Sequence, residues 1–247
     1  MSKTIGIDLG TTNSYVGLFG YAQGATIKNL TLSGGSVRGA MYLGALVGTA
    51  ENCTITGCFN EAEVQSVGTK VGSIAGLATG TTIDSSGNFG IVSSTCHDSP
   101  IVGGFVGQSY ANDVTNNFTN SFNRGHVIVA VGQAASPSAG HIGGLVAYSG
   151  SSRVNIVNCY NTGDTVAYAM GGAGVVGSYK TTGYMTITNT YYVRGNAYYQ
   201  QAFMDAYSDW TSAAGSGTVE KWDASSMKTQ NFATTLNSKV FIYNASI

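Results

Sequence analysis

Short apolar segments bracketed by glycine recur along most of the chain. Six copies end at residues 20, 48, 76, 107, 147 and 177, so that successive copies lie 28, 28, 31, 40 and 30 residues apart. The copies are Val16–Gly20, Gly44–Gly48, Gly72–Gly76, Gly103–Gly107, Gly143–Ala147 and Ala173–Gly177. A nearly constant period with a few longer intervals is typical of a repeat array that carries loop insertions.

Alternating polar and β-branched residues follow the glycine-bracketed segment in most copies. The clearest stretches are Ala25–Ile27, Cys53–Ile55, Thr81–Ile83, Arg153–Ile156 and Met185–Ile187. Because side chains alternate between the two faces of a strand, short alternating runs bounded by Gly, Asn and Ser predict strands. A small or polar residue followed by an aromatic one marks the next part of the copy, in Cys58-Phe59, Asn88-Phe89, Ser121-Phe122, Cys159-Tyr160 and Thr190-Tyr191.

The repeated strands predict an all-β fold, a β-solenoid (β-helix-like) of about six coils with a small irregular or helical C-terminal cap. One coil of short strands cannot bury its own apolar face, but a neighbouring coil about 4.8 Å away can cover it. A β-sandwich with glycine-rich turns is the alternative, which explains the alternation but not the regular return of one motif. The predicted division is an N-terminal segment at 1–15, solenoid repeats at 16–195 and an aromatic-rich cap at 196–247.

Stacked coils would align equivalent side chains in ladders. An inward apolar ladder would contain Leu46, Ile74, Phe105, Leu145 and Val175. A second inward ladder would contain the aromatic residues Phe59, Phe89, Phe122, Tyr160 and Tyr191. A hydrogen-bonded corner ladder would contain Asn60, Asn123 and Asn161, because Asn tolerates left-handed backbone and bonds locally. The motif glycines would serve either corners with positive φ or places where two backbones pack closely.

Composition supports a folded chain that is rich in strands and turns. Gly accounts for 35 of 247 residues and Pro for only 2, without a three-residue period, which excludes collagen. Charged residues make up only 9% of the chain, whereas disordered chains are usually highly charged and poor in aromatic residues. The net charge is −1 and the basic residues are scattered, so nucleic-acid binding is not expected.

The four cysteines, Cys53, Cys58, Cys96 and Cys159, form no CxxC pairs and have no His at zinc-ligand spacing. They are too sparse to be the main support of the fold, so we expect buried free thiols, with disulfides as the alternative. No apolar run reaches the roughly 18 residues of a membrane span. The N-terminal residues lack the apolar core of a signal peptide.

The repeat resembles the GLUG family, which is named for its glycine–leucine–any residue–glycine signature. The resemblance covers roughly residues 15–195, and Ser226–Phe232 followed by Leu236-Asn237 resembles segments that close such arrays. Members occur in bacterial surface proteins, adhesin-like proteins and non-catalytic regions of immunoglobulin-A-cleaving metallopeptidases. The resemblance implies an extracellular or cell-surface location, as part of a larger surface protein. It implies no reaction.

Residues 4–14 resemble the first phosphate-binding strand and turn of the seventy-kilodalton heat-shock chaperones. The resemblance implies that Asp8 would lie near a metal and that the ATP phosphates would be lined by Gly10, Thr11, Thr12 and Asn13. Backbone N–H groups in a glycine-containing turn suit an anion. However, the second phosphate loop and the adenosine-binding glycine pair of that family are absent from the sequence. We therefore expect a strand that caps the first coil, or a tag, and neither ATP binding nor another cofactor.

Aromatic residues are concentrated near the C-terminal end of the sequence. The candidate ligand-binding residues are Tyr198, Tyr199, Tyr207, Trp210 and Trp222, because exposed rings stack on sugars or anchor a protein partner. The alternative is that these rings cover the open end of the solenoid, whose edge strands would otherwise pair with other chains. Short helices are expected at Gln201–Tyr207 and Ala224–Leu236.

Catalytic chemistry has little support in the sequence. The histidines His97, His126 and His141 lie in different copies, and neither His-Glu-x-x-His nor Gly-x-Ser-x-Gly occurs. The carboxylates that a carbohydrate-active β-helix might gather on one face are Glu51, Glu61, Glu63, Asp84, Asp113 and Asp164. The three glutamates belong to one copy and the three aspartates are unevenly spaced, so neither a catalytic nor a metal site is expected.

The leading hypothesis is a non-catalytic structural or adhesive module. It would present a broad polar face, rich in Thr, Ser and Asn, to a glycan or to a protein of the host or cell surface. A carbohydrate-active β-helix enzyme is the rival hypothesis, and it would need several carboxylates close together in a groove. A designed or recombined chain without a selected function is the third alternative, because the chaperone-like start joins the repeats abruptly.

Overall fold

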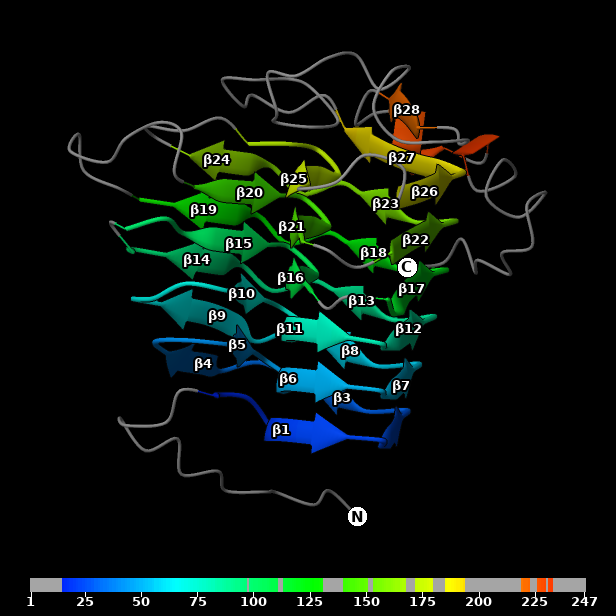
Figure 1. The fold of residues 1–247 in the computed structure, drawn as a ribbon. Helices are drawn as coiled ribbons and strands as arrows, with labels where there is room; N and C mark the ends of the chain where they lie inside the picture. The colour runs from blue at the N-terminus through cyan, green and yellow to red at the C-terminus, as the bar shows by residue number, and fades with distance from the viewer. Residues whose placement is uncertain are drawn as a thin grey trace.

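The fold comes from a computed structural model that describes residues 15–96, 98–110, 113–130, 140–150, 153–167, 172–179, 185–193, 219–222, 226–229 and 231–232. These residues form an all-β solenoid in which strands of successive coils pair in parallel and in register. The coils stack along one axis from the N-terminal to the C-terminal end (Figure 1). The predicted fold class is therefore confirmed.

Five sheets, which we name A to E, run along the stack. Sheet A contains β5 (Leu43–Gly44), β10 (Val71–Gly72), β15 (Ile101–Gly103) and β20 (His141–Gly143). Sheet B contains β1 (Phe19–Gln23), β6 (Val47–Glu51), β11 (Ala75–Thr79), β16 (Val106–Ser109), β21 (Val146–Ser149) and β25 (Val176–Tyr179). Sheet C contains β2 (Thr26–Lys28), β7 (Thr54–Thr56), β12 (Thr82–Asp84), β17 (Thr115–Thr119), β22 (Arg153–Val157) and β26 (Met185–Thr188).

The remaining sheets complete each coil. Sheet D contains β3 (Thr31–Leu32), β8 (Phe59–Asn60), β13 (Gly87–Asn88), β18 (Phe122–Asn123), β23 (Tyr160–Asn161), β27 (Thr190–Val193) and β28 (Val219–Trp222). Sheet E contains β4 (Ser36–Gly39), β9 (Glu63–Ser66), β14 (Val92–Ser94), β19 (Val127–Val129) and β24 (Thr165–Ala167). Five coils thus follow one another, and a sixth contributes β25, β26 and β27.

The C-terminal region adds one strand that the sequence pattern did not predict. β28 pairs in parallel with β27 and so extends sheet D by a seventh strand. Helical backbone follows at η1 (Ser226–Lys228) and at residues 231–232, within the range expected to be helical. The other expected helix, Gln201–Tyr207, lies outside the described residues.

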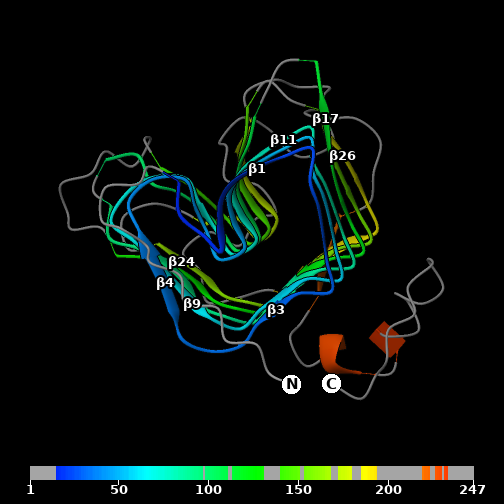
Figure 2. The ribbon, with the colours of Figure 1, turned by 90° about the horizontal axis from the view of Figure 1, so that it is seen from below.

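Viewed along the axis, the outline of the coil has two lobes that meet where sheets A and B lie side by side (Figure 2). The chain runs through sheet A, reverses within the glycine-bracketed motif and returns through sheet B. It then passes through sheets C and D around one lobe and through sheet E around the other. The motif therefore forms the reversal that separates the two lobes.

Glycine is required in this reversal because the two backbones touch. A Cβ on Gly72 would lie 2.3 Å from the carbonyl oxygen of Ala75, and one on Gly76 would lie 2.5 Å from the carbonyl carbon of Tyr42. Real Cβ atoms do not approach backbone atoms this closely, so a side chain at either position would push the sheets apart. Neither glycine has a positive φ. Of the two expected roles, close backbone approach is the one that the structure shows.

The predicted inward apolar ladder is confirmed. Leu46, Ile74, Phe105, Leu145 and Val175 are each at most 2% exposed. A second inward row comes from the middle residues of sheet C, Ile27, Ile55, Ile83, Phe118, Ile156 and Ile187. The smaller lobe has its own core, built on Leu43, Val71, Val102 and Ile142 from sheet A and on valines of sheet E. Burying one such side chain stabilises the fold by about 1.5–3 kcal/mol.

The aromatic ladder exists, but its direction and register were predicted wrongly. Phe59 and Asn60 are neighbours in β8 and point to opposite faces, and it is Asn60 that points inward with Cys58. The aromatic residues therefore lie on the outer face of sheet D, where Met227 and Phe232 pack against them. In the third coil Gly87, rather than Phe89, is the register partner of Phe59.

The four cysteines are buried free thiols, as expected. Cys58 and Cys159 belong to an inward row of small hydrogen-bonding residues that also contains Ser86, Ser121 and Thr190. Each side chain donates to the carbonyl oxygen two residues earlier, as Ser121 Oγ does to Thr119 (2.7 Å) and Cys159 Sγ to Val157 (3.4 Å). Burial raises the pKa of Cys159 to about 12. In this row a cysteine takes the place of a serine.

Candidate binding surface

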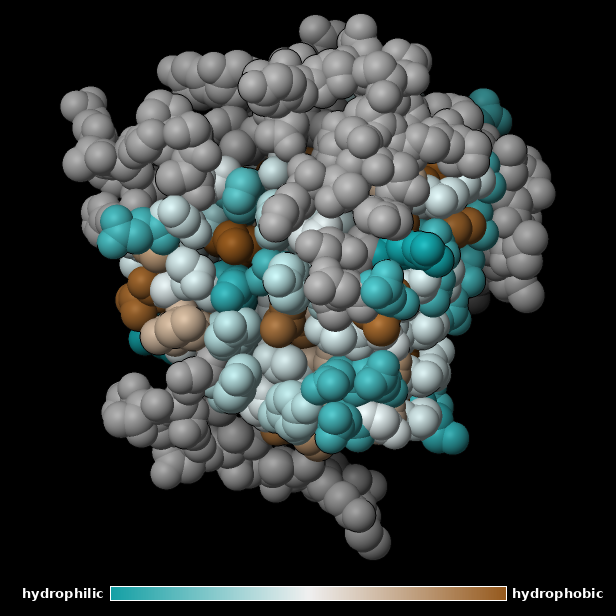
Figure 3. All heavy atoms as spheres, viewed as in Figure 1, coloured by the Kyte–Doolittle hydropathy of each residue, from teal (hydrophilic) through white to brown (hydrophobic). Residues whose placement is uncertain are grey.

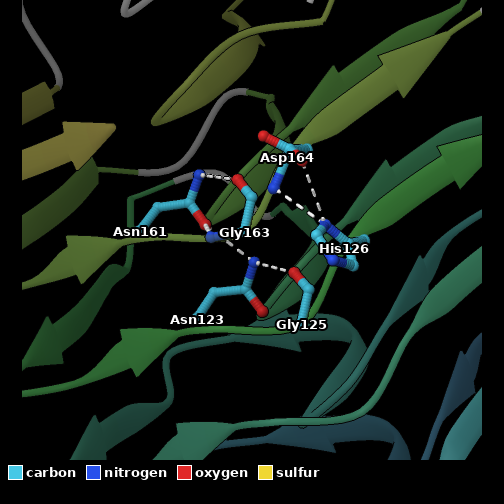
Figure 4. Close-up of polar contacts among 6 residues, drawn as sticks. All are labelled: Asn123, Gly125, His126, Asn161, Gly163 and Asp164. Carbon is cyan, nitrogen blue, oxygen red and sulfur yellow. Dashed lines mark hydrogen bonds and ion pairs between the residues drawn. The ribbon is translucent and has the colours of Figure 1, made fainter. Parts of the chain in front are cut away.

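A buried spine of four asparagines runs through sheet D, formed by Asn60, Asn88, Asn123 and Asn161. Asn123 shows the pattern: its Nδ2 donates to Asn161 Oδ1 and to the carbonyl oxygen of Gly125, both at 2.8 Å (Figure 4). Its own Oδ1 accepts from Asn88 Nδ2 at 2.7 Å. The predicted hydrogen-bonded ladder is confirmed and also contains Asn88, but its predicted place at a corner was wrong: the four residues lie within strands of sheet D and none has a positive φ. These side chains are at most 1% exposed, so the spine holds coils together and offers nothing to a ligand.

A contact between a histidine and an aspartate lies beside this spine on the surface. His126 Nδ1 accepts the backbone N–H of Asp164 at 3.2 Å and lies 3.5 Å from Asp164 Oδ2 (Figure 4). A ring nitrogen that accepts an N–H carries no proton, so the ion pair forms only when His126 is protonated and the N–H contact is lost. The two side chains are 52% and 40% exposed, and such pairs contribute about 0–1 kcal/mol. The contact links neighbouring coils.

The outer face of sheet C is a flat polar surface, which we call the threonine–asparagine face. Its first row contains Thr26, Thr54, Thr82, Asn117, Asn155 and Thr186, which are register partners from coil to coil. Its second row contains Lys28, Thr56, Asp84, Thr119, Val157 and Thr188. The alternating sequence creates this face, because each strand sends an Ile or Phe into the core and the residues on either side of it outward.

Part of this face is held by its own hydrogen bonds. Asn155 Nδ2 donates to Asn117 Oδ1 at 2.8 Å, and Asp84 Oδ1 accepts from Thr119 Oγ1 at 2.5 Å and from Asn120 Nδ2 at 2.8 Å. A corner ladder continues from Asn120 through Asn158 to Asn189 at 3.1 Å per step. Asn120, Asn158 and Asn189 all have φ near +50°, which Asn tolerates better than most residues. In the later coils, from Asn117 onward, the amide side chains of this face are therefore held in fixed positions by one another.

In the second and third coils the face carries threonine hydroxyls that are available to bind a ligand. Within the described part of the chain, the side-chain hydroxyls of Thr54, Thr56 and Thr82 make no hydrogen bond to another residue, and Thr54 is exposed. Each hydroxyl supplies one donor and two acceptor positions to an external group. Because sheet C is held from inside by its isoleucine row, these groups are fixed at the spacing of the strands. These hydroxyls thus form a rigid array of free hydrogen-bonding groups.

The carboxylates lie on different parts of the surface. Glu51 ends β6 in sheet B, where it accepts a hydrogen bond from the Tyr21 hydroxyl, and Glu61 accepts from Ser33 at 2.6 Å. Asp84 accepts a hydrogen bond from Thr119 in sheet C, and Asp164 contacts His126. Across the described ranges, no cluster of three or more His, Cys, Asp or Glu residues is arranged to hold a metal ion.

The site residues predicted from the sequence cannot be placed on this surface. The nucleotide-binding candidates Asp8, Gly10, Thr11, Thr12 and Asn13 lie outside the described residues, and so do Tyr198, Tyr199, Tyr207 and Trp210. Trp222 ends β28, but its side chain is not among those described. Those predictions stay untested. The sequence predicted a polar face rich in Thr and Asn without its position, and the outer surface of sheet C is such a face.

The solenoid and its flat polar face define the protein as a β-solenoid repeat protein. Residues 39–65, most of the second coil, match the family model described as the GLUG motif. The motif and the stacked parallel sheets together are consistent with a GLUG repeat protein and fit a surface repeat module. GLUG motifs occur in general in extracellular or surface proteins. No curated protein is similar enough to the chain to count as a relative.

In the ranges given above, no helix is long and apolar enough to cross a membrane.

Proposed function

We propose that the protein is a non-catalytic module of a surface protein that binds glycans through the threonine–asparagine face. The observation that carries the proposal is the row Thr26, Thr54 and Thr82, continued by Asn117 and Asn155, on one flat sheet. Sugars carry hydroxyls at short, regular intervals, and a rigid row of hydroxyl and amide groups can meet several of them at once. A long, shallow contact of this kind binds without enclosing its ligand.

The distribution of charge supports a binding role rather than hydrolysis. Hydrolysis of a glycosidic bond needs two carboxyl groups about 5–10 Å apart on either side of the bond. On the threonine–asparagine face Asp84 is the only carboxylate among the described residues, and its Oδ1 already accepts hydrogen bonds from Thr119 and Asn120. One carboxylate cannot supply the pair of carboxyl groups that this reaction needs.

A glycan array followed by isothermal titration calorimetry tests the proposal. The informative variant is Thr54→Val/Thr82→Val, which keeps the shape of both side chains and removes two hydroxyls. Neither hydroxyl has a partner in the described structure, so the fold should be unaffected. Losing two hydrogen bonds of about 0.7 kcal/mol each should weaken binding about tenfold.

The matched control is Thr95→Val, an exposed threonine beyond the end of β14 on the other lobe. It should bind like the wild type. If Thr54→Val/Thr82→Val also binds like the wild type, the glycan contacts a different surface. If the wild type binds no glycan at all, the proposal itself is wrong.

A further inference from the structure

Three tyrosines, which we call the tyrosine cluster, gather at the first-coil end of sheets A and B. The ring centroid of Tyr15 lies 5.1 Å from that of Tyr42 and 6.2 Å from that of Tyr21. Tyr15 and Tyr21 remain 46% and 49% exposed, so their rings are held together without being covered. Tyrosine rings offer a flat apolar face with few side-chain torsions to restrict on binding. The ring planes of Tyr15 and Tyr21 are inclined by 62° to each other, so the cluster is a platform that presents the face of one ring to a ligand and places a second ring at the ligand's edge.

Polar groups of opposite charge flank this platform. Lys70 Nζ donates to the hydroxyl of Tyr42 at 3.0 Å and lies 4.3 Å from the centre of its ring. On the other side the Glu51 carboxylate accepts a hydrogen bond from the Tyr21 hydroxyl, which raises the pKa of Tyr21. One cation and one carboxylate leave the platform without a net charge. The arrangement favours a neutral ligand that has hydroxyl groups at its edge.

Two members of this site hold an unusual backbone conformation. Tyr42 has a φ of 47° and Lys70 a φ of 63°, which are strained values for residues with long side chains. They occupy equivalent positions in successive coils, just before β5 and β10. The equivalent residues of the next coils, Ile101 and His141, have no positive φ. The turn into sheet A has a positive φ in the next coil as well, but there it falls on Ser99, whose side chain is short. Strained backbone at residues with long side chains is often found at ligand-binding positions.

An unpaired hydroxyl lies next to the cluster. Thr49 is the register partner of Tyr21 in sheet B and is only 6% exposed. Its Oγ1 is buried and makes no hydrogen bond within the described structure. A buried polar atom without a partner disfavours folding unless a water molecule or a ligand group satisfies it.

Polar side chains predominate over the ends of β1 and β6 (Figure 3), although Phe19 and Met41, close to Tyr21 and Tyr42 in the sequence, are each 41% exposed. In Figure 3, hydrophilic side chains gather over the ends of β1 and β6, and hydrophobic ones appear singly on the described part of that face. A protein-docking patch would present a continuous apolar area. The ends of β1 and β6 also lead directly into β2 and β7 of sheet C. The tyrosine cluster therefore lies around one corner from the threonine–asparagine face.

We propose that the tyrosine cluster is the anchoring subsite for a neutral pyranose residue of the bound glycan. The C–H face of the sugar ring would stack on Tyr21, and the ring of Tyr15, whose plane is inclined by 62° to that of Tyr21, would contact the edge of the sugar. Lys70 and Glu51 would bond to its hydroxyls. This inference rests on the proposed glycan-binding function and assigns the stacking contact that the threonine–asparagine face lacks. That face extends the contact along the glycan, and the cluster fixes one end.

Calorimetry with neutral hexasaccharides of glucose, galactose and mannose, and with a hexauronate for comparison, tests this subsite. Tyr15→Ala/Tyr21→Ala should weaken binding of the preferred neutral hexasaccharide at least tenfold. The control Tyr110→Ala removes an equally exposed tyrosine, beyond the end of β16 and outside the cluster, and should bind like the wild type. Thr49→Val should weaken binding without lowering the unfolding midpoint, because it removes a hydroxyl that the fold does not use.

The outcomes separate the two proposals. If the wild type binds a neutral hexasaccharide and Tyr15→Ala/Tyr21→Ala binds it equally well, the subsite is refuted and the threonine–asparagine face stands. Preference for the hexauronate would likewise overturn the neutral subsite. If the wild type binds none of the four probes but binds another glycan of the array, the neutral subsite is refuted and the proposed function stands. If it binds no glycan at all, both proposals are wrong. A Thr49→Val variant that is destabilised and binds normally would show that this hydroxyl serves the fold instead.

Discussion

The ring of Phe122 occupies the space in which a side chain on Gly87 would lie. The two residues are register partners in neighbouring strands of sheet D, and a Cβ on Gly87 would come within 2.3 Å of the Phe122 ring. Phe89 packs edge-on against the same ring, with centroids 5.1 Å apart. In the third coil the ladder position is therefore occupied by Gly87, and the aromatic residue, Phe89, comes two residues later. The outer aromatic ladder stays continuous in spite of this gap.

Gly87→Ala tests this arrangement. The added methyl group should force the ring of Phe122 away from Phe89 and Tyr160, and overpacking of this kind costs about 1–3 kcal/mol. Urea unfolding measures the loss. In a double-mutant cycle with Phe122→Leu the two changes should be strongly non-additive, because the smaller side chain makes room for the methyl group. Additive effects would show that the two residues do not meet.

The glycine reversal predicts a larger effect at Gly76 than at Gly87. A Cβ on Gly76 would meet backbone atoms of Tyr42 and Leu43, which cannot rotate away as a ring can. We expect Gly76→Ala to lower the free energy of unfolding by about 3 kcal/mol or more. Ala147 occupies the equivalent position in the fifth coil, so Ala147→Gly should cost only about 1 kcal/mol. Equal effects at the two positions would contradict the close approach of sheets A and B.

The asparagine spine predicts a dependence on pH that the wild type does not have. Asn123→Asp would place a carboxylate against two acceptors, Asn161 Oδ1 and the carbonyl oxygen of Gly125. The folded state would then favour the protonated acid, so the pKa of the introduced carboxyl group would be higher in the folded than in the unfolded chain. Stability should therefore rise as the pH is lowered from 7 to about 4, which is the unfolded-state pKa. Thermal unfolding at several pH values measures this, and a pH-independent loss would argue against the assigned hydrogen bonds.

Cys159 should be unreactive until the protein unfolds. Its pKa of about 12 keeps it a thiol in the folded state, whereas in the unfolded chain it titrates near 8.5. The contribution of this group to stability is present below about pH 8.5 and is lost as the pH rises toward about 12. Labelling with a thiol-specific disulfide reagent at pH 8 should thus follow global unfolding. Cys159→Ser should keep the bond to the Val157 carbonyl oxygen and remove part of the alkaline loss of stability, whereas rapid labelling of the native protein would refute the burial.

The sequence predicted the parts of the fold that repeat by residue type. The positions of Leu46, Ile74 and Phe105 follow from the glycine period alone, and Asn60, Asn123 and Asn161 follow from their fixed distance to the aromatic marker. The polar face was predicted in kind because Thr and Asn alternate with Ile. These features depend only on which residues recur, and recurrence is visible in a sequence.

The features that were missed depend on contacts between coils. Asn88-Phe89-Gly90 matched the aromatic marker by type, but Asn88 aligns with Asn60, and this places Gly87 on the ladder. The outward direction of the aromatic rings follows from the inward direction of Asn60, and a sequence pattern does not show which of two alternating residues faces the core. The tyrosine cluster escaped detection because Tyr15, Tyr21 and Tyr42 come from two coils and share no motif.

In-register stacking of the coils is the claim on which the binding surface depends, and a thiol pair tests it most directly. Thr54 and Thr82 are register partners about 4.8 Å apart, whereas Thr54 and Asp84 are two residues out of register and about 8 Å apart. Dibromobimane, which becomes fluorescent when it bridges two neighbouring thiols, should react rapidly with the folded Thr54→Cys/Thr82→Cys variant. Thr54→Cys/Asp84→Cys should react far more slowly. Equal bridging of both pairs, or faster bridging of the second, would contradict the register and with it the threonine–asparagine face.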